Sequence, residues 1–165
     1  MGRPHGVPAL MSKITKSVEV DVPVTTAYNQ WTQFEDFPQF MEGVKSVRQL
    51  DDKTLEWTAE IAGIKRSWRA EIVDQQPDRR ISWRSTSGAR HNGVVTFDSL
   101  GDNRTRVNLE LDVDPEGFVE NVGDALGILD RRVKGDMGRF KEFMEARGQE
   151  TGAWRGEVQE GSRTR

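Results

Sequence analysis

Apolar and polar residues alternate over several short stretches between residues 14 and 113, which is typical of strands with one buried face. In the first stretch, ITKSVEVDV, Ile14, Val18 and Val20 share one phase, and Pro23 follows its end. Further alternating stretches cover 44–50, 54–61, 64–73, 79–86, 90–100 and 104–113. Turn residues separate them, so the sequence predicts an antiparallel meander.

Helical spacing occurs in two places. VTTAYNQWTQF, residues 24–34, predicts a short helix, and Pro38 disfavours helical geometry for Phe37, so a new segment is expected at FPQFM. After DPEG, apolar residues recur at steps of three or four, which predicts one long amphipathic helix with Pro115 in its first turn. Its apolar positions are Phe118, Val122, Leu126, Leu129, Val133, Met137, Phe140 and Met144. The charged residues between them are interpreted as a solvated face.

Strand phase also assigns the inward faces of the predicted sheet. These faces carry Trp57, Trp68 and Trp83, and their polar exceptions are Arg66, Ser85 and His91. Turns in a meander alternate between the two ends of a sheet, so the turns at Gly63 and Gly88 and the DPEG junction are expected at one end. Arg66, Ser85 and His91 would lie near that end, with FPQFMEG beside them. The sequence therefore predicts the mouth of a pocket there, gated by the aromatic residues after Pro38.

Composition excludes several kinds of site. The 165-residue chain has no cysteine, which removes disulfides, thiolate nucleophiles and iron–sulfur centres. A net charge of −3 and a pI near 5.5 argue against a nucleic-acid partner. There are two histidines, no Gly-x-Ser-x-Gly elbow and no phosphate-binding glycine motif. We expect no cofactor and no metal: Asp112, Asp114 and Glu116 begin like a calcium loop, but Gly123 stands where its bidentate glutamate belongs.

The chain divides into three parts on composition. Residues 1–13 are expected to be a disordered N-terminal tail, 14–147 one domain, and 148–165 a polar C-terminal tail that contains Trp154. No apolar run is long enough to span a bilayer, and MGRPHGVPAL lacks the features of a secretion signal. We therefore expect a cytoplasmic protein; peripheral membrane contact and oligomeric state stay open.

The order of elements, with VPVTTAYNQWTQFEDFPQFMEGVKSVRQL after the first strand and RRVKGDMGRFKEFMEARG in the last helix, resembles the polyketide cyclase/dehydrase and lipid-transport family. That family belongs to the START-like, or helix-grip, superfamily (SRPBCC, Bet v 1-like). The resemblance implies an α+β fold in which a curved, seven-stranded antiparallel sheet wraps around a long C-terminal helix, with two short helices after the first strand. A strongly twisted sheet can curl around such a helix without touching it everywhere, so an internal cavity is expected.

The leading functional hypothesis is binding of a small apolar ligand, such as a polyketide, quinone or lipid, as a carrier or binding protein. The alternative is a polyketide aromatase/cyclase that closes a poly-β-ketone chain by aldol cyclisation and dehydration, with Arg66 as electrophile and His91 as acid/base. An arginine and hydroxyl pair expected on the fourth strand of such enzymes would fall near Ala70 and Ile72, which weakens this alternative. A third option is a protein-interaction role, with a membrane assembly or with the ribosome; the acidic balance disfavours the ribosome.

Each candidate residue also has a purely structural interpretation. The three tryptophans could be ordinary core, Arg66 a rim guanidinium paired with a carboxylate, and His91 a histidine satisfied near a turn. The residues expected to bind ligand are Phe37, Phe40, Met41, Trp57, Arg66, Trp68, Trp83, Ser85, His91, Val95 and Leu126.

Overall fold

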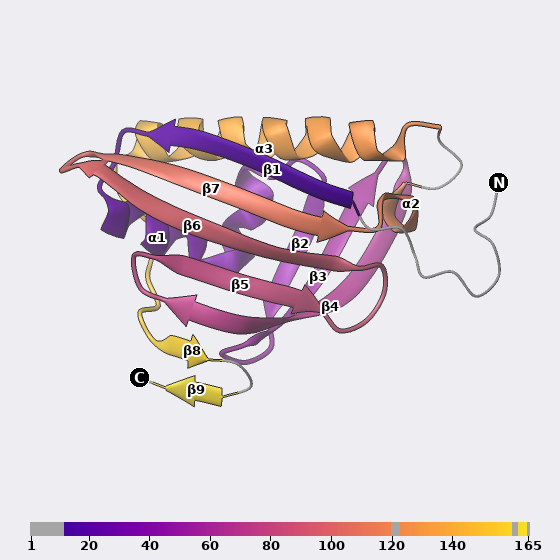
Figure 1. The fold of residues 1–165 in the computed structure, drawn as a ribbon, viewed down its shortest axis with the longest axis horizontal. Coiled ribbons are helices and arrows are strands. Elements are labelled where there is room, and N and C mark those ends of the chain that lie inside the picture. The colour runs from indigo at the N-terminus through magenta and orange to yellow at the C-terminus, as the bar shows by residue number, and fades with distance from the viewer. Residues whose placement is uncertain (1–11, 120–122, 160–161, 165) are drawn as a thin grey trace.

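The structure, a computed structural model, describes residues 12–119, 123–159 and 162–164. The order predicted from the sequence is confirmed: a strand, two short helices, six strands and a long helix (Figure 1). The strands are β1 Ser12–Val20, β2 Val44–Gln49, β3 Thr54–Ile61, β4 Ile64–Gln76, β5 Arg80–Ser85, β6 His91–Gly101, β7 Arg104–Val113, β8 Glu157–Gln159 and β9 Ser162–Thr164. The helices are α1 Val24–Trp31, the 3-10 helix η1 Phe34–Gln39, α2 Pro115–Phe118 and α3 Ala125–Arg147.

One curled antiparallel sheet contains the first seven strands in the order β1-β7-β6-β5-β4-β3-β2. Helix α3 lies along its open side, close to β1 (Figure 1). On the β1 side, Lys16 pairs with Asp130 at 2.8 Å. On the β2 side, Nε of Arg139 donates to the carbonyl oxygen of Phe40 at 3.0 Å. Side chains of α3 thus join edge strand β1 to the segment that precedes edge strand β2.

The two short helices separate earlier than the sequence predicted. The hydroxyl of Thr32 donates to the carbonyl oxygen of Asn29 at 2.6 Å, and Gln33, with ψ 70°, leaves the helical path. Pro38 instead lies inside η1. The chain therefore changes direction at Thr32 and Gln33, between α1 and η1, and not at Pro38.

The long helix was predicted to start near Pro115, and that start was wrong. Val119 is extended, with φ −130° and ψ 92°, and ends α2. The carboxylate of Asp124 then accepts a hydrogen bond from the backbone of Gly127 at 3.1 Å, so Asp124 caps α3. Val122 lies outside the described residues. Because α3 starts afresh, Leu126 is 39% exposed instead of joining the apolar stripe.

Strand phase holds for most of the sheet but changes in β4. Pairing with β5 shifts register between Ile72 and Asp74, as at a β-bulge. The extra residue reverses which side of the strand faces inward, so Gln75 is buried with 1% exposure. The alternation seen in the sequence gave no sign of this change.

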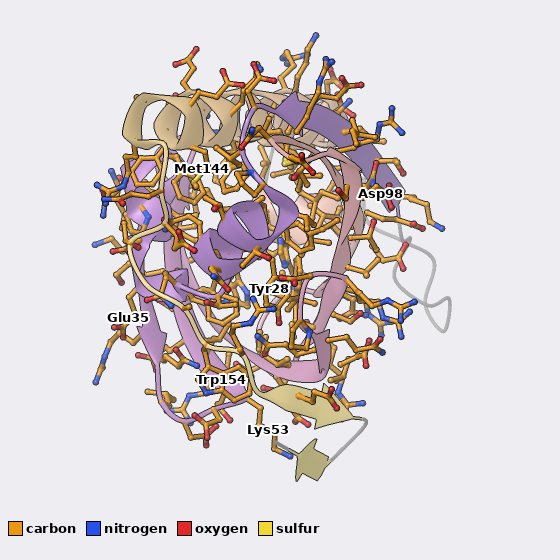
Figure 2. The ribbon with its side chains drawn as sticks, turned by 90° about the vertical axis from the view of Figure 1, so that its left-hand side faces the viewer. Tyr28, Glu35, Lys53, Asp98, Met144 and Trp154 are labelled. Carbon is orange, nitrogen blue, oxygen red and sulfur yellow. The ribbon has the colours of Figure 1, made fainter. Side chains whose placement is uncertain are left out.

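The C-terminal segment packs against the domain. The carboxylate of Glu150 accepts from Asn29 at 2.7 Å, and the backbone N–H of Trp154 donates to the hydroxyl of Thr32 at 3.0 Å. Figure 2 shows the segment running past α1, which carries Tyr28, down to Trp154. Strand β8 then pairs with β4 at Gln75 and Val158, beyond the end of the β3 ladder.

Candidate functional site

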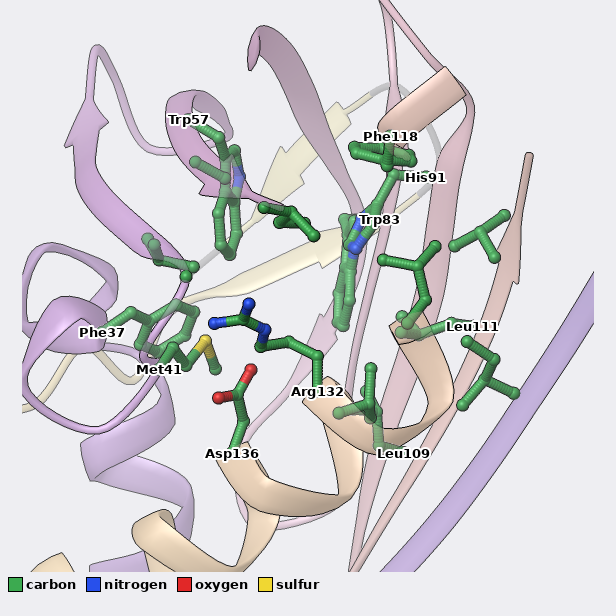
Figure 3. Close-up of a pocket in the computed structure, with 18 of the residues that line it drawn as sticks. Phe37, Met41, Trp57, Trp83, His91, Leu109, Leu111, Phe118, Arg132 and Asp136 are labelled. Atoms are coloured by element: carbon green, nitrogen blue, oxygen red, sulfur yellow. The ribbon is translucent and has the colours of Figure 1, made fainter. Parts of the chain in front are cut away.

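An internal cavity of about 110 Å³ lies between the concave face of the sheet and α3 (Figure 3). Its walls are apolar residues and one glycine, apart from His91, Arg132 and Asp136. Strands β3 to β7 supply most of the sheet side, because their inward positions carry the large side chains. Figure 3 shows Arg132 and Asp136 beside Met41 and Phe37, and His91 at the other end with Trp83 and Phe118.

Three tryptophans form one wall of the cavity. Trp57 and Trp68 are direct cross-strand partners on β3 and β4, and their rings stack with centroids 5.7 Å apart and planes 8° from parallel. Phe118 packs edge-on against Trp68, with centroids 5.1 Å apart. Among the described residues, the buried Nε1 atoms of Trp57 and Trp68 have no hydrogen-bond partner. This wall therefore holds two unused donors.

The third tryptophan, Trp83, determines which ring nitrogen of His91 carries the hydrogen. Nε1 of Trp83 donates to Nδ1 of His91 at 3.2 Å. An indole nitrogen can only donate, so Nδ1 must be unprotonated and the neutral ring carries its hydrogen on Nε2. Burial lowers the pKa of His91 to about 4. The ring is thus uncharged near neutral pH and offers the cavity a hydrogen-bond donor.

Six of the residues expected to bind ligand do line the cavity: Phe37, Met41, Trp57, Trp68, Trp83 and His91. The other five, Phe40, Arg66, Ser85, Val95 and Leu126, are not among its lining residues. Phe40 is buried against Phe140, with centroids 5.3 Å apart. Val95 is fully buried elsewhere in the core, and Leu126 is exposed.

Arg66 and Ser85 lie at the predicted end of the sheet, but their side chains form hydrogen bonds with backbone groups there. Nε of Arg66 donates to the carbonyl oxygen of Gly117 at 3.0 Å, which joins β4 to α2. The hydroxyl of Ser85 accepts from the backbone N–H of His91 at 3.1 Å. Phe118 then packs on His91, with centroids 5.7 Å apart. The two rings thus lie in contact at the end where the mouth was expected.

Arg132 and Asp136 were not predicted as site residues. They lie one turn apart on α3, beside the apolar positions Val133 and Met137, within the face interpreted as solvated. Burial raises the pKa of Asp136, while the guanidinium of Arg139 opposes that rise. The sequence feature that could have identified them as site residues is the position of this Arg/Asp pair at the border of the apolar stripe.

Two other findings limit the chemistry. Within residues 12–119, 123–159 and 162–164, no three histidine, aspartate or glutamate side chains are grouped as metal ligands. In the same part of the chain, no helix is long and apolar enough to cross a membrane.

Comparison with known proteins places these features in a wider group. The sequence model of the polyketide cyclase/dehydrase and lipid transport family matches residues 20–142. An uncharacterized 17.2 kDa protein of Streptomyces lincolnensis, from the melC2-rnhH intergenic region, is 52% identical over 149 residues, which are 90% of this chain and 99% of that protein.

Two solved structures share the fold. The Zhui aromatase/cyclase from a Streptomyces species has a TM-score of 0.71 at 14% identity, covering 88% of this chain and all of the other. A START superfamily protein from Mycobacterium smegmatis has a TM-score of 0.65 at 17% identity, covering 82% of this chain and 95% of the other. Identities this low support the START-like, helix-grip architecture alone.

Proposed function

Because this chain belongs to the polyketide cyclase/dehydrase and lipid transport family, we propose that it binds a small, mostly apolar molecule as a carrier or binding protein. A polyketide, a quinone or a lipid-like molecule has the required character. The observation that carries the proposal is the cavity, whose walls are apolar except for His91, Arg132 and Asp136. Ligand sites commonly combine such walls with a few polar groups that orient the ligand.

The polar groups of the aromatic wall favour a ligand that carries oxygen. Nε1 of Trp57, Nε1 of Trp68 and Nε2 of His91 are all hydrogen-bond donors. A buried donor without a partner costs about 1–3 kcal/mol. A carbonyl or hydroxyl oxygen of a quinone or polyketide would accept from such donors, whereas a plain hydrocarbon would leave them unsatisfied.

The size of the cavity adds a requirement. At about 110 Å³ it is smaller than an engineered cavity of about 150 Å³ that binds benzene. A ligand larger than one ring must therefore widen the space. Helix α3 can move away from the sheet without breaking the strand ladder, because side-chain bonds join it to β1 and to Phe40.

Native mass spectrometry of freshly purified protein, together with fluorescence titration of the neutral probe N-phenyl-1-naphthylamine, tests this function. Ala59 lines the cavity, and Thr58 is its neighbour on the opposite face of β3. We expect Ala59→Leu to weaken probe binding and Thr58→Leu to leave it unchanged. Failure of the wild-type protein to bind any apolar probe would overturn the proposal, and so would equal effects of the two substitutions.

A second candidate function, aldol cyclisation of a poly-β-ketone chain, is supported by one observation. His91 lines the cavity as a neutral ring with a hydrogen on Nε2, which could stabilise a developing enolate oxygen. With its pKa lowered to about 4, His91 is better suited to donate a hydrogen bond than to act as a base at neutral pH. Arg66 would act here through its bond to Gly117, because it does not line the cavity.

To distinguish an enzyme from a carrier, product formation and dye binding are measured on the same variants. For a cyclase, His91→Ala should abolish conversion of a poly-β-ketone analogue while N-phenyl-1-naphthylamine still binds. Arg66→Ala should lower conversion less, since its effect passes through α2. If wild-type protein forms no more cyclised product than buffer, the carrier function stands alone.

A further inference from the structure

The apolar cavity has one charged wall. Arg132 and Asp136 both line it, and their side chains are 24% and 15% exposed. Figure 3 shows the guanidinium and the carboxylate on the same side, near Met41. Charged groups in an apolar wall are costly unless they are paired, so the partners of each group indicate its role.

Asp136 is well satisfied by groups of the protein. Oδ1 accepts from the guanidinium of Arg139 and from the backbone N–H of Glu42, the latter at 3.2 Å. Arg139 also donates to the carbonyl oxygen of Phe40. These bonds attach α3 to the chain that enters β2; Arg132 also acts on Asp136, but through charge alone, and helps to lower the pKa of its carboxyl against the rise that burial causes.

Arg132 is paired more weakly. Its Nη1 lies 3.4 Å from Oε1 of Glu42, longer than the roughly 2.7–2.9 Å of a strong charge-assisted bond. The same carboxylate also lies 3.4 Å from Nη1 of Arg139. The side chain of Glu42 is 66% exposed, and exposed ion pairs contribute about 0–1 kcal/mol. Water can therefore replace Arg132 as the partner of Glu42 at little cost.

The surroundings of Arg132 form a seam between α3 and the segment 40–44. Met41, Val44 and Val133 line the cavity there, and each is only half-buried, so the cavity wall is thin at this seam. Gly43 lies against the guanidinium: a Cβ added at this position would be 3.3 Å from Nη1 of Arg132. Gly43 is buried, and as a glycine it places no side chain against the guanidinium.

We propose that this seam is the entrance to the cavity and that Arg132 binds the acidic group of the ligand. The ligand is then an organic anion, with a carboxylate or similar group at the seam and an apolar body inside. On binding, that group replaces the carboxylate of Glu42, which turns to solvent. Arg132 and Arg139 then face Asp136 and the ligand, so the local charge stays balanced. This inference rests on the ligand-binding function proposed above.

A matched pair of dyes tests the assignment. 8-Anilinonaphthalene-1-sulfonate carries an acidic group, and N-phenyl-1-naphthylamine has the same ring system without it. We expect Arg132→Gln to weaken binding of the sulfonate about tenfold, the effect of losing one hydrogen bond to a charged group, and to change binding of the neutral dye less than about twofold. Glu42→Gln should strengthen sulfonate binding, because it removes the competing carboxylate.

Arg131 provides the control, because it lies next to Arg132 on α3 but is 69% exposed and pairs with Asp124 at 3.9 Å. Arg131→Gln removes the same charge and should leave both dyes unaffected. Equal loss of sulfonate binding in the two arginine variants would overturn the inference, and so would equal loss of both dyes in Arg132→Gln. If neither dye binds the wild-type protein, the proposed ligand-binding function itself fails; dye binding that is indifferent to Arg132 overturns the inference alone.

Discussion

The indole Nε1 of Trp83 donates a hydrogen bond to Nδ1 of His91 across 3.2 Å, from β5 to β6. The bond and burial act in the same direction. Burial lowers the pKa of His91, and protonation of Nδ1 would also force Trp83 to give up its acceptor. This end of the cavity therefore depends on a histidine that stays neutral.

The stability of the protein should reflect that neutrality. The unfolded chain takes up a proton on His91 near its ordinary pKa of 6.5, whereas the folded chain resists until about pH 4. Between these values the unfolded state binds more protons, so the free energy of unfolding falls as the pH is lowered, by about 3 kcal/mol in all. Above pH 6.5 this contribution is fully retained.

Two measurements check this expectation. Urea unfolding at pH 7 and pH 5 should show a larger loss for wild type than for His91→Gln, which cannot titrate in this range. Proton NMR should show that the ring of His91 stays neutral at pH 5; His5→Gln leaves His91 as the one histidine and so assigns its signal. A ring of His91 that titrates near pH 6.5 would contradict the prediction.

Gly93 lies directly under the indole of Trp83. A Cβ at this position would approach Cζ2 of Trp83 to 2.5 Å and Cδ2 of Leu111 to 2.7 Å. We expect Gly93→Ala to displace Trp83, break its bond to His91 and destabilise the fold by about 1–3 kcal/mol. Thermal unfolding and tryptophan fluorescence measure both effects. Gly138→Ala is the control, because a Cβ there meets nothing within 4 Å.

Phe40 and Met41 are neighbours with different roles. Phe40 is 2% exposed and packs against Phe37, Phe140 and Phe143, so Phe40→Ala should cost about 3–5 kcal/mol of stability. Met41 is half-buried and lines the cavity, so Met41→Ala should mainly weaken binding of N-phenyl-1-naphthylamine. Denaturation and dye titration separate the two. If Phe40→Ala is stable but binds the dye differently, this prediction is wrong, and Phe40 acts as the gate expected from the sequence.

Arg155 anchors the C-terminal segment. Its guanidinium lies 2.9 Å from Oδ2 of Asp78, donates to Oδ1 of Asn29 at 2.7 Å and lies over the ring of Tyr28. These contacts are partly exposed, so Arg155→Ala should cost about 1 kcal/mol. It should also speed thermolysin cleavage between Arg147 and Val158. Arg131→Ala removes an arginine from the outer face of α3 and should leave cleavage unchanged.

The sheet could be predicted because its strands are short, alternate regularly and end at turn residues. The start of α3 could not, because spacing alone does not show that Asp124 caps a new helix when the apolar spacing of Phe118 and Leu126 continues across the break. The inward position of Gln75 depends on a bulge, which is set by pairing with β5 and leaves no mark in β4 itself.

The candidate site was predictable where a side chain points from the middle of a strand into the interior, as for Trp57 and Trp83. Near the ends of strands the prediction was mixed, because His91 lines the cavity whereas Arg66 bonds to Gly117 instead. Arg132 was missed for a different reason. Whether a charge at the border of an apolar stripe faces water or the interior depends on how the helix is rotated against both edges of the sheet, which one sequence does not reveal.

The cavity also has a mechanical consequence. Empty space inside a folded protein is lost on unfolding, so hydrostatic pressure favours the unfolded chain in proportion to that space. A cavity of about 110 Å³ makes this protein pressure-sensitive, and a ligand that fills it should make the protein harder to compress. The pressure at which half the molecules unfold is therefore a measure of how full the cavity is.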